Sequence, residues 1–358
     1  MKIKDFINYE QPNNYIVSSE RYSNMYAVPV LTAGQSFILG YTDEKIGVYN
    51  KGECIIFDDF TTSVHYVDFP FKVKSSAMKI LTCNSNANLK YCYYLLLKLS
   101  SMPENHKRQW ISTTSEKNWC LPNVERQNQI VYKMDLLTKT IELYEKQINL
   151  LNDLIKARFI EMFGDPVSNS KHLPLKTLPQ LGTFGRGVSK YRPRNAPELL
   201  NGPYPLIQTG DIANSELYIK NYNNTYSEIG LKQSKMWDKG TLCITIAANI
   251  AKTAILQFDA CFPDSVVGFN GNTLTDNIFL HYWFSFFQEI LENQAPESAQ
   301  KNINLKILSE LQIITPDIIE QNQFADFVRQ VDKSREAVKK TLEKIQQLYD
   351  SLMQEYFG

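Results

Sequence analysis

The chain has 358 residues, and 38 aspartates and glutamates balance its 38 lysines and arginines, so the formal net charge is zero. Hydrophobic residues make up 43% of it and charged residues 21%, which excludes an intrinsically disordered chain. No apolar run approaches the ~18 residues of a membrane-spanning helix, and the length predicts two or three domains of ~100–200 residues each.

Targeting and metal-binding signals are missing from the sequence. The first ten residues, MKIKDFINYE, lack the apolar core of a signal peptide, so we expect a cytoplasmic protein. The six cysteines are scattered without a C-x-x-C pair and should be reduced thiols. The four histidines show no metal-ligand spacing such as H-E-x-x-H, so no bound metal is expected.

The first globular segment, residues 1–121, carries a basic window. Between Asp68 and Glu104 the sequence has no acidic residue. The lysines of this window are Lys72, Lys74, Lys79, Lys90 and Lys98. A charge run is most often a solvated surface, but an acid-free window also suits a DNA backbone. Lys72 and Lys74 alternate with Phe71 and Val73, which predicts a strand whose exposed face carries the lysines.

A long helix is predicted next, over residues 122–164. Pro122 precedes it, Gly164 follows it, and no proline or glycine interrupts the 40 residues between, which would extend ~60 Å as a helix. Apolar and aromatic residues recur at alternating steps of four and three, the a/d heptad of a coiled coil. These positions are Ile130, Met134, Leu137, Ile141, Tyr144, Ile148, Leu151 and Ile155.

The second globular segment, residues 165–315, loosely repeats the first. PLIQTG from Pro205 is similar to PVLTAG from Pro29, and DNIFLHYWFSF from Asp276 lies where LKYCYYLLLKL from Leu89 lies in the first segment. The stretch CITIAANIAKTAIL predicts buried strands of a mixed sheet, and IFLHYWFSFF predicts a buried helix. A second acid-free window contributes Lys171, Lys176, Arg186, Lys190, Arg192 and Arg194.

The last segment, residues 316–358, repeats the first helix 194 residues later. PNVERQNQI from Pro122 recurs as PDIIEQNQF from Pro316, and EMFG recurs as EYFG at the end of the chain. Seven of the eight heptad positions are again apolar or aromatic. The exception is Arg335, and a polar residue at an a or d position commonly fixes the register of a coiled coil. The positions are Phe324, Val328, Val331, Arg335, Val338, Leu342, Ile345 and Tyr349. Two like domains on two like helices, paired antiparallel, suit a duplex with two half-sites separated by a gap.

Several motifs together resemble one family. They are the two P-x-x-x-x-Q helix starts, MFGDP, RGVSKYRPRN, PLIQTGDI and CFPDSVVGF, with YEQP and PVLTAGQSFILGYTDE in the first domain. Along its whole length the chain resembles the specificity (S) subunit of type I restriction–modification enzymes. The resemblance implies an α+β fold in which two α/β target recognition domains alternate with two long helices that pair as an antiparallel, pseudo-twofold coiled coil. The implied boundaries are 1–121 and 165–315 for the domains, and 122–164 and 316–358 for the helices.

The resemblance also implies a function. Such a chain reads a bipartite site in double-stranded DNA, docks two methyltransferase subunits together with restriction and motor subunits, and catalyses nothing. S-adenosylmethionine, ATP and Mg²⁺ are implied in those partner subunits, with no cofactor bound by this chain, no membrane contact, and a bacterial or archaeal cytoplasm as the location. The residues agree, because neither a G-x-x-x-x-G-K-[ST] phosphate loop nor an N/D-P-P-Y/F tetrapeptide is present.

The DNA-contacting residues are predicted from residue type and loop context. Arginine and lysine neutralise phosphates, and arginine also reads guanine. In the second domain the candidates are Arg186, Ser189, Lys190, Tyr191, Arg192, Arg194, Gln208, Thr209 and Asn249. In the first domain they are Thr32, Gly34, Gln35, Tyr41 and Lys45. Tyr191 could instead be a structural ring and Asn249 could hold a buried turn, while Asp211 is expected to cap its turn rather than contact DNA.

Two other interpretations remain open at this point. The chain could be the specificity part of a methyltransferase fusion, which the missing catalytic motifs and the short length disfavour. Alternatively, it could be a bivalent coiled-coil scaffold whose two domains bind ligands other than DNA. Methyl transfer by the isolated chain would favour the fusion, and no binding to DNA in the presence of methyltransferase would favour the scaffold.

Overall fold

The computed structural model describes residues 1–32, 36–100, 108–247, 250–294 and 305–358. The chain divides into two compact units. Unit 1 contains residues 1–145 and 340–358, and unit 2 contains residues 146–339. Each unit therefore combines one globular part with the N-terminal half of one long helix and the C-terminal half of the other. No helix among the described residues is long and apolar enough to span a membrane.

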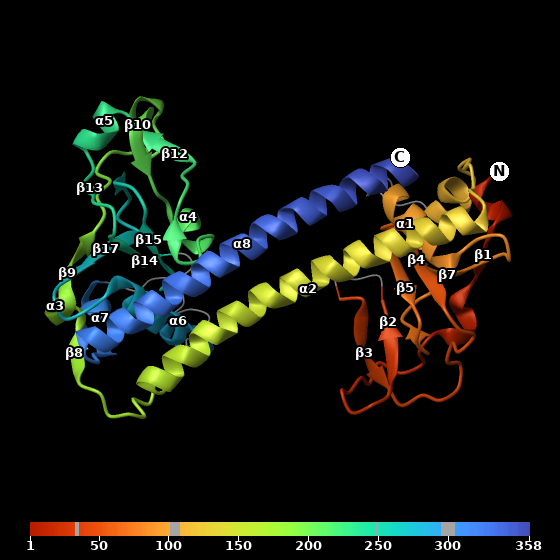
Figure 1. The fold of residues 1–358 in the computed structure, drawn as a ribbon, viewed down its shortest axis with the longest axis horizontal. Helices are drawn as coiled ribbons and strands as arrows, with labels where there is room; N and C mark the ends of the chain where they lie inside the picture. The colour runs from red at the N-terminus through yellow and green to blue at the C-terminus, as the bar shows by residue number, and fades with distance from the viewer. Residues whose placement is uncertain (33–35, 101–107, 248–249, 295–304) are drawn as a thin grey trace. The chain divides into compact units, whose positions relative to one another are not determined.

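The described part of unit 1 contains two sheets with α1 packed beside the larger one (Figure 1). Antiparallel strands in the order β1-β7-β4-β5 form the larger sheet, whose strand β4 is buried at every residue. The smaller sheet has the order β3-β2-β6, with β2 and β6 parallel. The strands are β1 (Ile7–Glu10), β2 (Val28–Leu31), β3 (Ile38–Thr42), β4 (Cys54–Asp58), β5 (Val64–Val67), β6 (Lys72–Val73) and β7 (Met78–Cys83), and the helices are η1 (Ile3–Asp5), η2 (Pro12–Tyr15), α1 (Leu89–Leu99) and η3 (Trp110–Thr114).

The described part of unit 2 contains three sheets. The largest has the order β11-β15-β14-β17-β9 and is mixed, because β11 pairs parallel with β15 while the other pairs are antiparallel. This confirms the mixed sheet expected from CITIAANIAKTAIL, and α6 confirms the buried helix. The strands are β8 (Leu175–Thr177), β9 (Gly182–Arg186), β10 (Leu200–Leu206), β11 (Tyr218–Ile219), β12 (Asn224–Tyr226), β13 (Met236–Trp237), β14 (Leu242–Thr245), β15 (Thr253–Leu256), β16 (Ala260–Cys261), β17 (Val266–Gly271) and β18 (Gln312–Ile314). The shorter helices are α3 (Leu178–Leu181), η4 (Pro197–Leu199), α4 (Thr209–Ala213), α5 (Glu228–Lys232), α6 (Asn277–Gln294) and α7 (Leu305–Glu310).

The strand orders show that the two globular parts share one topology. The sheet β1-β7-β4-β5 of unit 1 corresponds to β9-β17-β14-β15 of unit 2, strand for strand and with the same antiparallel pairings. In the second sheet, β3-β2-β6 corresponds to β12-β10-β16, and in both units the last pair is parallel. The loose similarity of PVLTAG to PLIQTG therefore reflects equivalent strands, β2 and β10.

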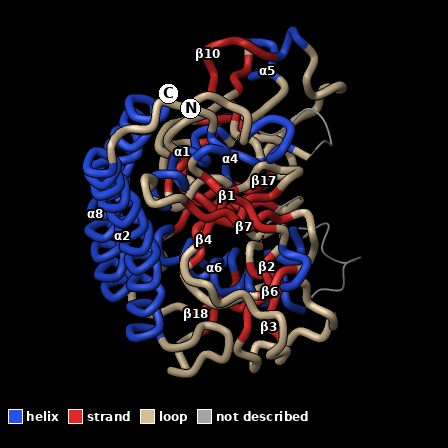
Figure 2. The backbone as a smooth tube through the Cα atoms, turned by 90° about the vertical axis from the view of Figure 1, so that its right-hand side faces the viewer, coloured by secondary structure: helices blue, strands red, loops and turns tan. Residues whose placement is uncertain are grey.

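The helices α2 (Val124–Phe163) and α8 (Ile318–Phe357) run side by side in both views of the backbone (Figures 1 and 2). In unit 1, Ile130 and Met134 of α2 share a core with Met353 and Phe357 of α8. In unit 2 the opposite ends meet, and Phe159 packs on Phe324 with ring centroids 5.4 Å apart. The helices are therefore antiparallel, and all sixteen predicted heptad positions are buried or half-buried.

One buried glutamine at the start of each long helix explains the repeated P-x-x-x-x-Q motif. In unit 1, the Nε2 of Gln127 donates to the carbonyls of Pro122 (2.7 Å) and Asn86 (3.1 Å), while its Oε1 accepts from the backbone N–H of Asn88 (2.7 Å). The side chain is fully buried. It therefore ties the first turn of α2 to the first turn of α1, whose N-cap is Asn88.

The same junction recurs in unit 2. Gln321 donates to the carbonyls of Pro316 (2.9 Å) and Leu274 (3.0 Å) and accepts from the backbone N–H of Asp276 (3.0 Å). Asp276 in turn caps α6 by accepting from Ile278 N at 2.7 Å. Asp276 and Asn88 are therefore equivalent residues. The repeat read from the sequence had placed Asp276 opposite Leu89, which is one residue too late in the first domain.

The basic window of the first domain does not form a free basic surface, and the predicted exposed face of Lys72 is wrong. Lys72 is 3% exposed, and its ammonium lies 2.7 Å from both the Glu44 carboxylate and the Ile46 carbonyl. Acids from elsewhere in unit 1 also pair with three of the other lysines. These pairs are Lys74–Glu20, Lys79–Asp59 and Lys90–Asp135. The acid-free window of the sequence is therefore neutralised in space.

Candidate nucleic-acid interface

The basic loop of unit 2 follows β9 and is held against the turn between β16 and β17. Gly187 N donates to the carbonyl of Val266 at 2.8 Å. A Cβ on Gly187 would lie 2.2 Å from the carbonyl oxygen of Phe262 and 2.4 Å from that of Pro263. Because no side chain fits there, the glycine allows the backbones of loop and turn to touch. Residues 187–196, here called the recognition loop, are thereby fixed beside residues 262–265.

A second set of bonds fixes the middle of the recognition loop. Gln233 Oε1 accepts from the backbone N–H groups of Lys190 (2.7 Å) and Tyr191 (3.1 Å), and Ser234 Oγ donates to the carbonyl of Val188 (2.8 Å). Tyr191 is 43% exposed, and its hydroxyl donates to Glu198 at 2.9 Å, a bond that raises the pKa of Tyr191. The Tyr191 ring is therefore held by one hydrogen bond at its hydroxyl but stays accessible to solvent. The peptide bond between Arg192 and Pro193 is cis.

The four cations nominated in this region fall into two pairs. Arg194 Nη2 lies 2.6 Å from Asp264 Oδ1, and Arg192 Nη2 lies 3.7 Å from Asp264 Oδ2. Arg192 Nη1 also donates to the carbonyls of Ser189 (2.6 Å) and Tyr191 (2.8 Å). Arg186 and Lys190 are exposed, and among the described residues neither has an ion pair. The recognition loop therefore presents one cation without an ion pair in the described structure, Lys190, and two that share one carboxylate, while Arg186 adds a second such cation from the end of β9.

Gln208 is the N-cap of the short helix α4, so the QTGD segment begins a helix, and Gln208 and Thr209 line the same hollow as the recognition loop. Asp211 Oδ2 accepts from Gln208 N at 2.8 Å, which confirms that Asp211 caps the turn. A hollow of about 250 Å³ is lined by four of the predicted residues: Ser189, Arg194, Gln208 and Thr209. Tyr226, Leu206, Pro263 and Ser265 complete its walls. Two separate segments of the chain thus converge on one small cavity.

The candidates of unit 1 are only partly described. Gly34 and Gln35 lie outside the described residues, as does Asn249 in unit 2. Thr32 N donates to the carbonyl of Phe37 at 2.9 Å, which closes the loop between β2 and β3. Tyr41 is half-buried in β3, where it pairs with Pro29, and Lys45 is exposed beyond the end of that strand. Thr32, Tyr41 and Lys45 therefore lie on or beside one hairpin, that of β2 and β3.

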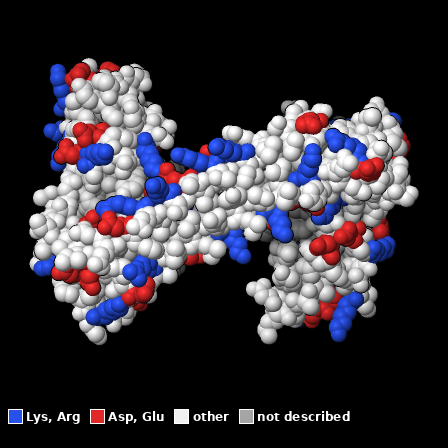
Figure 3. All heavy atoms as spheres, in the orientation of Figure 1, with Lys and Arg blue, Asp and Glu red and all other residues white. Residues whose placement is uncertain are grey.

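Residues that sequence reasoning did not nominate hold this site together. Asp264 and Gln233 brace the recognition loop from 70 and 43 residues away in sequence. Asp264 belongs to the CFPDSVVGF motif, so the sequence did mark its segment as part of the family pattern. A single aspartate, however, gives no sequence pattern that reveals its arginine partner. On the face that Figure 3 shows, lysines and arginines lie among acidic side chains rather than forming a continuous basic surface.

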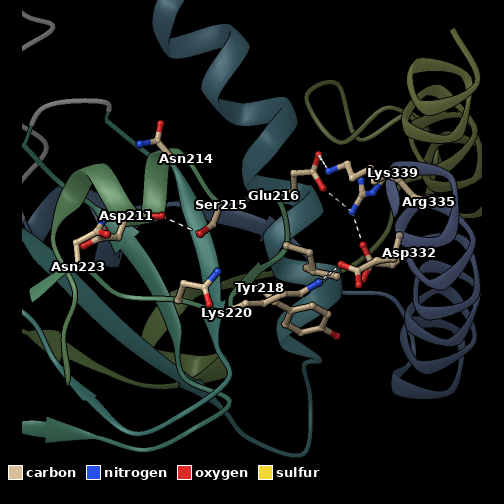
Figure 4. Close-up of a pocket in the computed structure, with 13 residues that line it drawn as sticks. Asp211, Asn214, Ser215, Glu216, Tyr218, Lys220, Asn223, Asp332, Arg335 and Lys339 are labelled. Carbon is tan, nitrogen blue, oxygen red and sulfur yellow. Dashed lines mark hydrogen bonds and ion pairs between the residues drawn. The ribbon is translucent and has the colours of Figure 1, made fainter. Parts of the chain in front are cut away.

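A second charged cluster in unit 2 surrounds Arg335, the polar exception in the heptad. Arg335 is 4% exposed, and its guanidinium contacts Asn152 Oδ1 (2.7 Å), Glu216 Oε2 (3.2 Å) and Asp332. Lys339 Nζ reaches the other oxygen of Glu216 at 2.6 Å. Figure 4 shows Arg335 and Lys339 of α8 directed toward Glu216 of the globular part, and Asp332 of α8 directed toward Arg335. Arg335 therefore joins both long helices to the globular part of unit 2.

Two hollows flank this cluster, of about 390 Å³ and 410 Å³, and Glu216 and Arg335 line both. Positive and negative groups are nearly balanced there, which suits a structural joint better than an ion-binding site. Among the residues that the structure describes, no group of histidine, cysteine, aspartate and glutamate is placed to hold a metal ion.

Comparison with known proteins agrees with this architecture. Residues 177–347 match the family model of the type I restriction modification DNA specificity domain. The type I restriction enzyme EcoR124I/EcoR124II specificity subunit of Escherichia coli is 31% identical over 361 residues, covering 93% of this chain and 86% of that protein.

Two solved structures share the fold. The S subunit of a type I restriction–modification system from M. genitalium has a TM-score of 0.65 at 14% identity and covers 100% of this chain and 95% of its own. A chain from a structure on complex assembly and conformational transition of a type I R-M system has a TM-score of 0.50 at 16% identity, covering 98% of this chain and 97% of its own. With two topologically equivalent globular parts on an antiparallel helix pair, and with 31% identity to an established member over nearly its whole length, this chain belongs to the family of type I restriction enzyme specificity subunits.

Proposed function

We propose that this chain reads a bipartite, gapped site in double-stranded DNA, with each globular part contacting one half-site. The observation that carries the proposal is the hollow of unit 2, where Ser189 and Arg194 of the recognition loop meet Gln208 and Thr209. Amide, hydroxyl and guanidinium groups are those that hydrogen-bond to base edges in the major groove. Their convergence on one rigid loop pair suits sequence discrimination better than general affinity for DNA.

Arg186 and Lys190 are proposed to contact phosphates. Both are exposed and have no ion pair among the described residues, so their charge is available to the DNA backbone. Each such contact adds ~0.9 to the slope of log affinity against log salt concentration. The zero net charge of the chain is compatible with this function, because phosphate contacts depend on cations placed at the interface rather than on the sum over the chain.

We propose that α2 also docks a methyltransferase subunit. Besides its buried heptad face, α2 exposes a second apolar stripe at a spacing of seven, formed by Leu136, Leu143 and Leu150, each more than half exposed. The positions 194 residues later in α8 are Gln330, Ala337 and Lys344. An exposed apolar row on a helix marks a protein interface. In this proposal the partner subunits carry out catalysis and bind S-adenosylmethionine, ATP and Mg²⁺. The assembly works in the cytoplasm.

Co-expression tests the DNA-reading function. The chain is produced with its cognate methyltransferase subunit, and single-molecule sequencing then locates methyladenine in the host DNA. We expect one bipartite motif with a fixed gap that disappears when this chain is omitted. A soluble complex that methylates no such motif would contradict the proposal and favour a bivalent scaffold without a DNA function.

Docking is tested separately from DNA recognition. Leu136→Glu with Leu143→Glu places two charges on the exposed stripe and should abolish co-purification of the methyltransferase subunit. Gln330→Glu is the matched control, since Gln330 occupies in α8 the place of Leu136 in α2 and is also exposed. Co-purification that survives the double substitution would exclude the stripe as the docking surface.

A further inference from the structure

One carboxylate organises the cations of the recognition loop. Asp264 lies in the turn between β16 and β17, and each of its oxygens faces a different arginine. Oδ1 is 2.6 Å from Arg194 Nη2, and Oδ2 is 3.7 Å from Arg192 Nη2. All three side chains are at least a third exposed, so the contacts are not a buried core pair. Burial does not explain why the carboxylate is here.

The position of Asp264 is set by the backbone. Gly187 N bonds to the carbonyl of Val266, and the lack of a Cβ at Gly187 allows direct contact with the backbone of Phe262 and Pro263. Val266 N also donates to the carbonyl of Pro263 at 3.0 Å, which closes the turn. The carboxylate is therefore held at a fixed place relative to the recognition loop. A guanidinium bound to it loses much of its rotamer freedom before any ligand arrives.

The remaining donors of Arg194 border an accessible hollow. Asp264 engages Nη2, and no other bond of the Arg194 side chain occurs within the described residues. Arg194 lines the 250 Å³ hollow together with Gln208 and Thr209. Ser189 also lines it, is 6% exposed, and its hydroxyl has no partner among the described residues. The hydroxyl of Ser189 is therefore open to a hydrogen bond with a group that enters the hollow.

Charge decides between the two ligands that arginine takes from DNA. A phosphate at Arg194 would lie close to the Asp264 carboxylate, and two anions repel each other. The N7 and O6 atoms of guanine are neutral acceptors, and they match two parallel N–H groups of a guanidinium. A braced arginine beside an acid therefore suits guanine, whereas Arg186 and Lys190, with no acid paired to them in the described structure, suit phosphate.

We propose that Asp264 is a positioning residue that orients Arg194 to read one guanine in the half-site bound by unit 2. The proposal rests on the DNA-reading function above. It adds that one recognised base is guanine, that Arg194 contacts it, and that Asp264 orients Arg194. Arg192, held to the carbonyls of Ser189 and Tyr191, keeps the loop shaped around the same carboxylate.

The test uses the complex of the full chain with its methyltransferase subunit, and duplexes carrying the motif that sequencing defines. In each duplex one guanine is replaced by 7-deazaguanine, which lacks only the N7 acceptor. One such replacement, in one half-site, should weaken binding of the wild-type complex about tenfold. In Asp264→Asn and in Arg194→Ala the same replacement should change binding by less than about twofold.

A second measurement separates aiming from a merely structural role. Asp264→Asn also removes the negative charge beside two arginines, so binding to a duplex without the motif should tighten about threefold to tenfold and become more salt-dependent. Asp259→Asn is the matched control: Asp259 is an exposed acid close by in sequence that accepts only from the backbone N–H of Lys239 in the described structure. It removes the same charge and should keep the full 7-deazaguanine effect.

The outcomes are distinguishable. Unchanged selectivity at the other positions of the same half-site shows that unit 2 is folded in each variant. If Asp264→Asn loses affinity for all duplexes in parallel, or keeps the full 7-deazaguanine effect, the positioning role is overturned while DNA reading stands. If the wild-type complex binds no motif at all, the DNA-reading function fails, and this inference fails with it.

Discussion

The buried glutamine at the start of α8 gives the sharpest prediction about stability. Gln321→Met keeps the volume of the side chain, so it creates little cavity. It removes two bonds to the carbonyls of Pro316 and Leu274 and leaves the backbone N–H of Asp276 without its partner. At about 1 kcal/mol for each lost bond, and more for the stranded donor, unit 2 should lose about 3 kcal/mol of unfolding free energy.

Calorimetry can measure this loss. For a unit of the size of residues 146–339, about 3 kcal/mol corresponds to a fall in Tm of roughly 6 to 12 °C. The control is Gln323→Met, two residues away in the same QNQ sequence but exposed, which should change the stability by less than about 0.5 kcal/mol. Gln127→Met should produce the same loss in the transition of unit 1. If Gln321→Met is no worse than Gln323→Met, the junction does not explain the repeated motif.

Three other predictions concern ionisable side chains that are buried in one of the two units. Asp59→Asn leaves the fully buried Lys79 without its carboxylate, so unit 1 should lose about 3 to 5 kcal/mol in urea unfolding, and Asp59→Asn with Lys79→Met should recover part of it; an equal loss in both variants would contradict the pairing argument. Burial lowers the pKa of His281 to about 4, so the unfolded state takes up a proton first as the pH falls below 6.5, and unit 2 should lose about 3 kcal/mol between pH 6.5 and 4. That loss should be absent in His281→Gln, and an identical pH profile in both proteins would refute it. Arg335→Met leaves Asp332 and Glu216 without their arginine but places an apolar residue in the heptad. It should therefore lower the unfolding free energy of unit 2 by less than the ~3 kcal/mol expected for breaking a fully buried pair. Lys339→Met removes only an exposed contact and should lower it by less than about 1 kcal/mol in the same assay.

The parts of the fold that repeat were predictable from sequence. A heptad over 40 residues, bounded by proline and glycine, specifies a helix through local spacing alone, and Gly164 indeed ends α2 with φ at +75°. The equal lengths and shared register of the two helices favoured pairing within one chain, and the family resemblance implied that the pair is antiparallel. The identity of the core at each end did not follow, because Phe159, Phe279 and Phe324 meet across segments more than 40 residues apart.

Charge was less predictable because it is paired in space rather than along the chain. The window from Lys72 to Lys98 has no acid in sequence, yet Glu44 and Asp135 reach into it from other elements. Hydrogen bonding from Lys72 and from the backbone of Ser18 and Ser19 lowers the pKa of Glu44, which keeps this carboxylate ionised. The same limit applied at the recognition loop, where the arginines were evident in sequence and Asp264 was not.

The equivalence of the two sheets allows the loop after β1 to be compared with the loop after β9. These strands occupy the same position in their sheets, but residues 11–27 after β1 contain a single cation, Arg21, whereas the segment after β9 contains Lys190, Arg192 and Arg194. The first loop is instead bound to an acid, since Glu44 accepts from the backbone N–H groups of Ser18 and Ser19. A guanine-reading arginine braced by an acid therefore has no counterpart at this position of unit 1, and the two half-sites should differ in their dependence on guanine N7. Arg21→Ala should leave the methylated motif unchanged, while Arg194→Ala should relax one position of one half-site. A loss of selectivity at the opposite half-site in Arg21→Ala would show that both loops read bases in the same way.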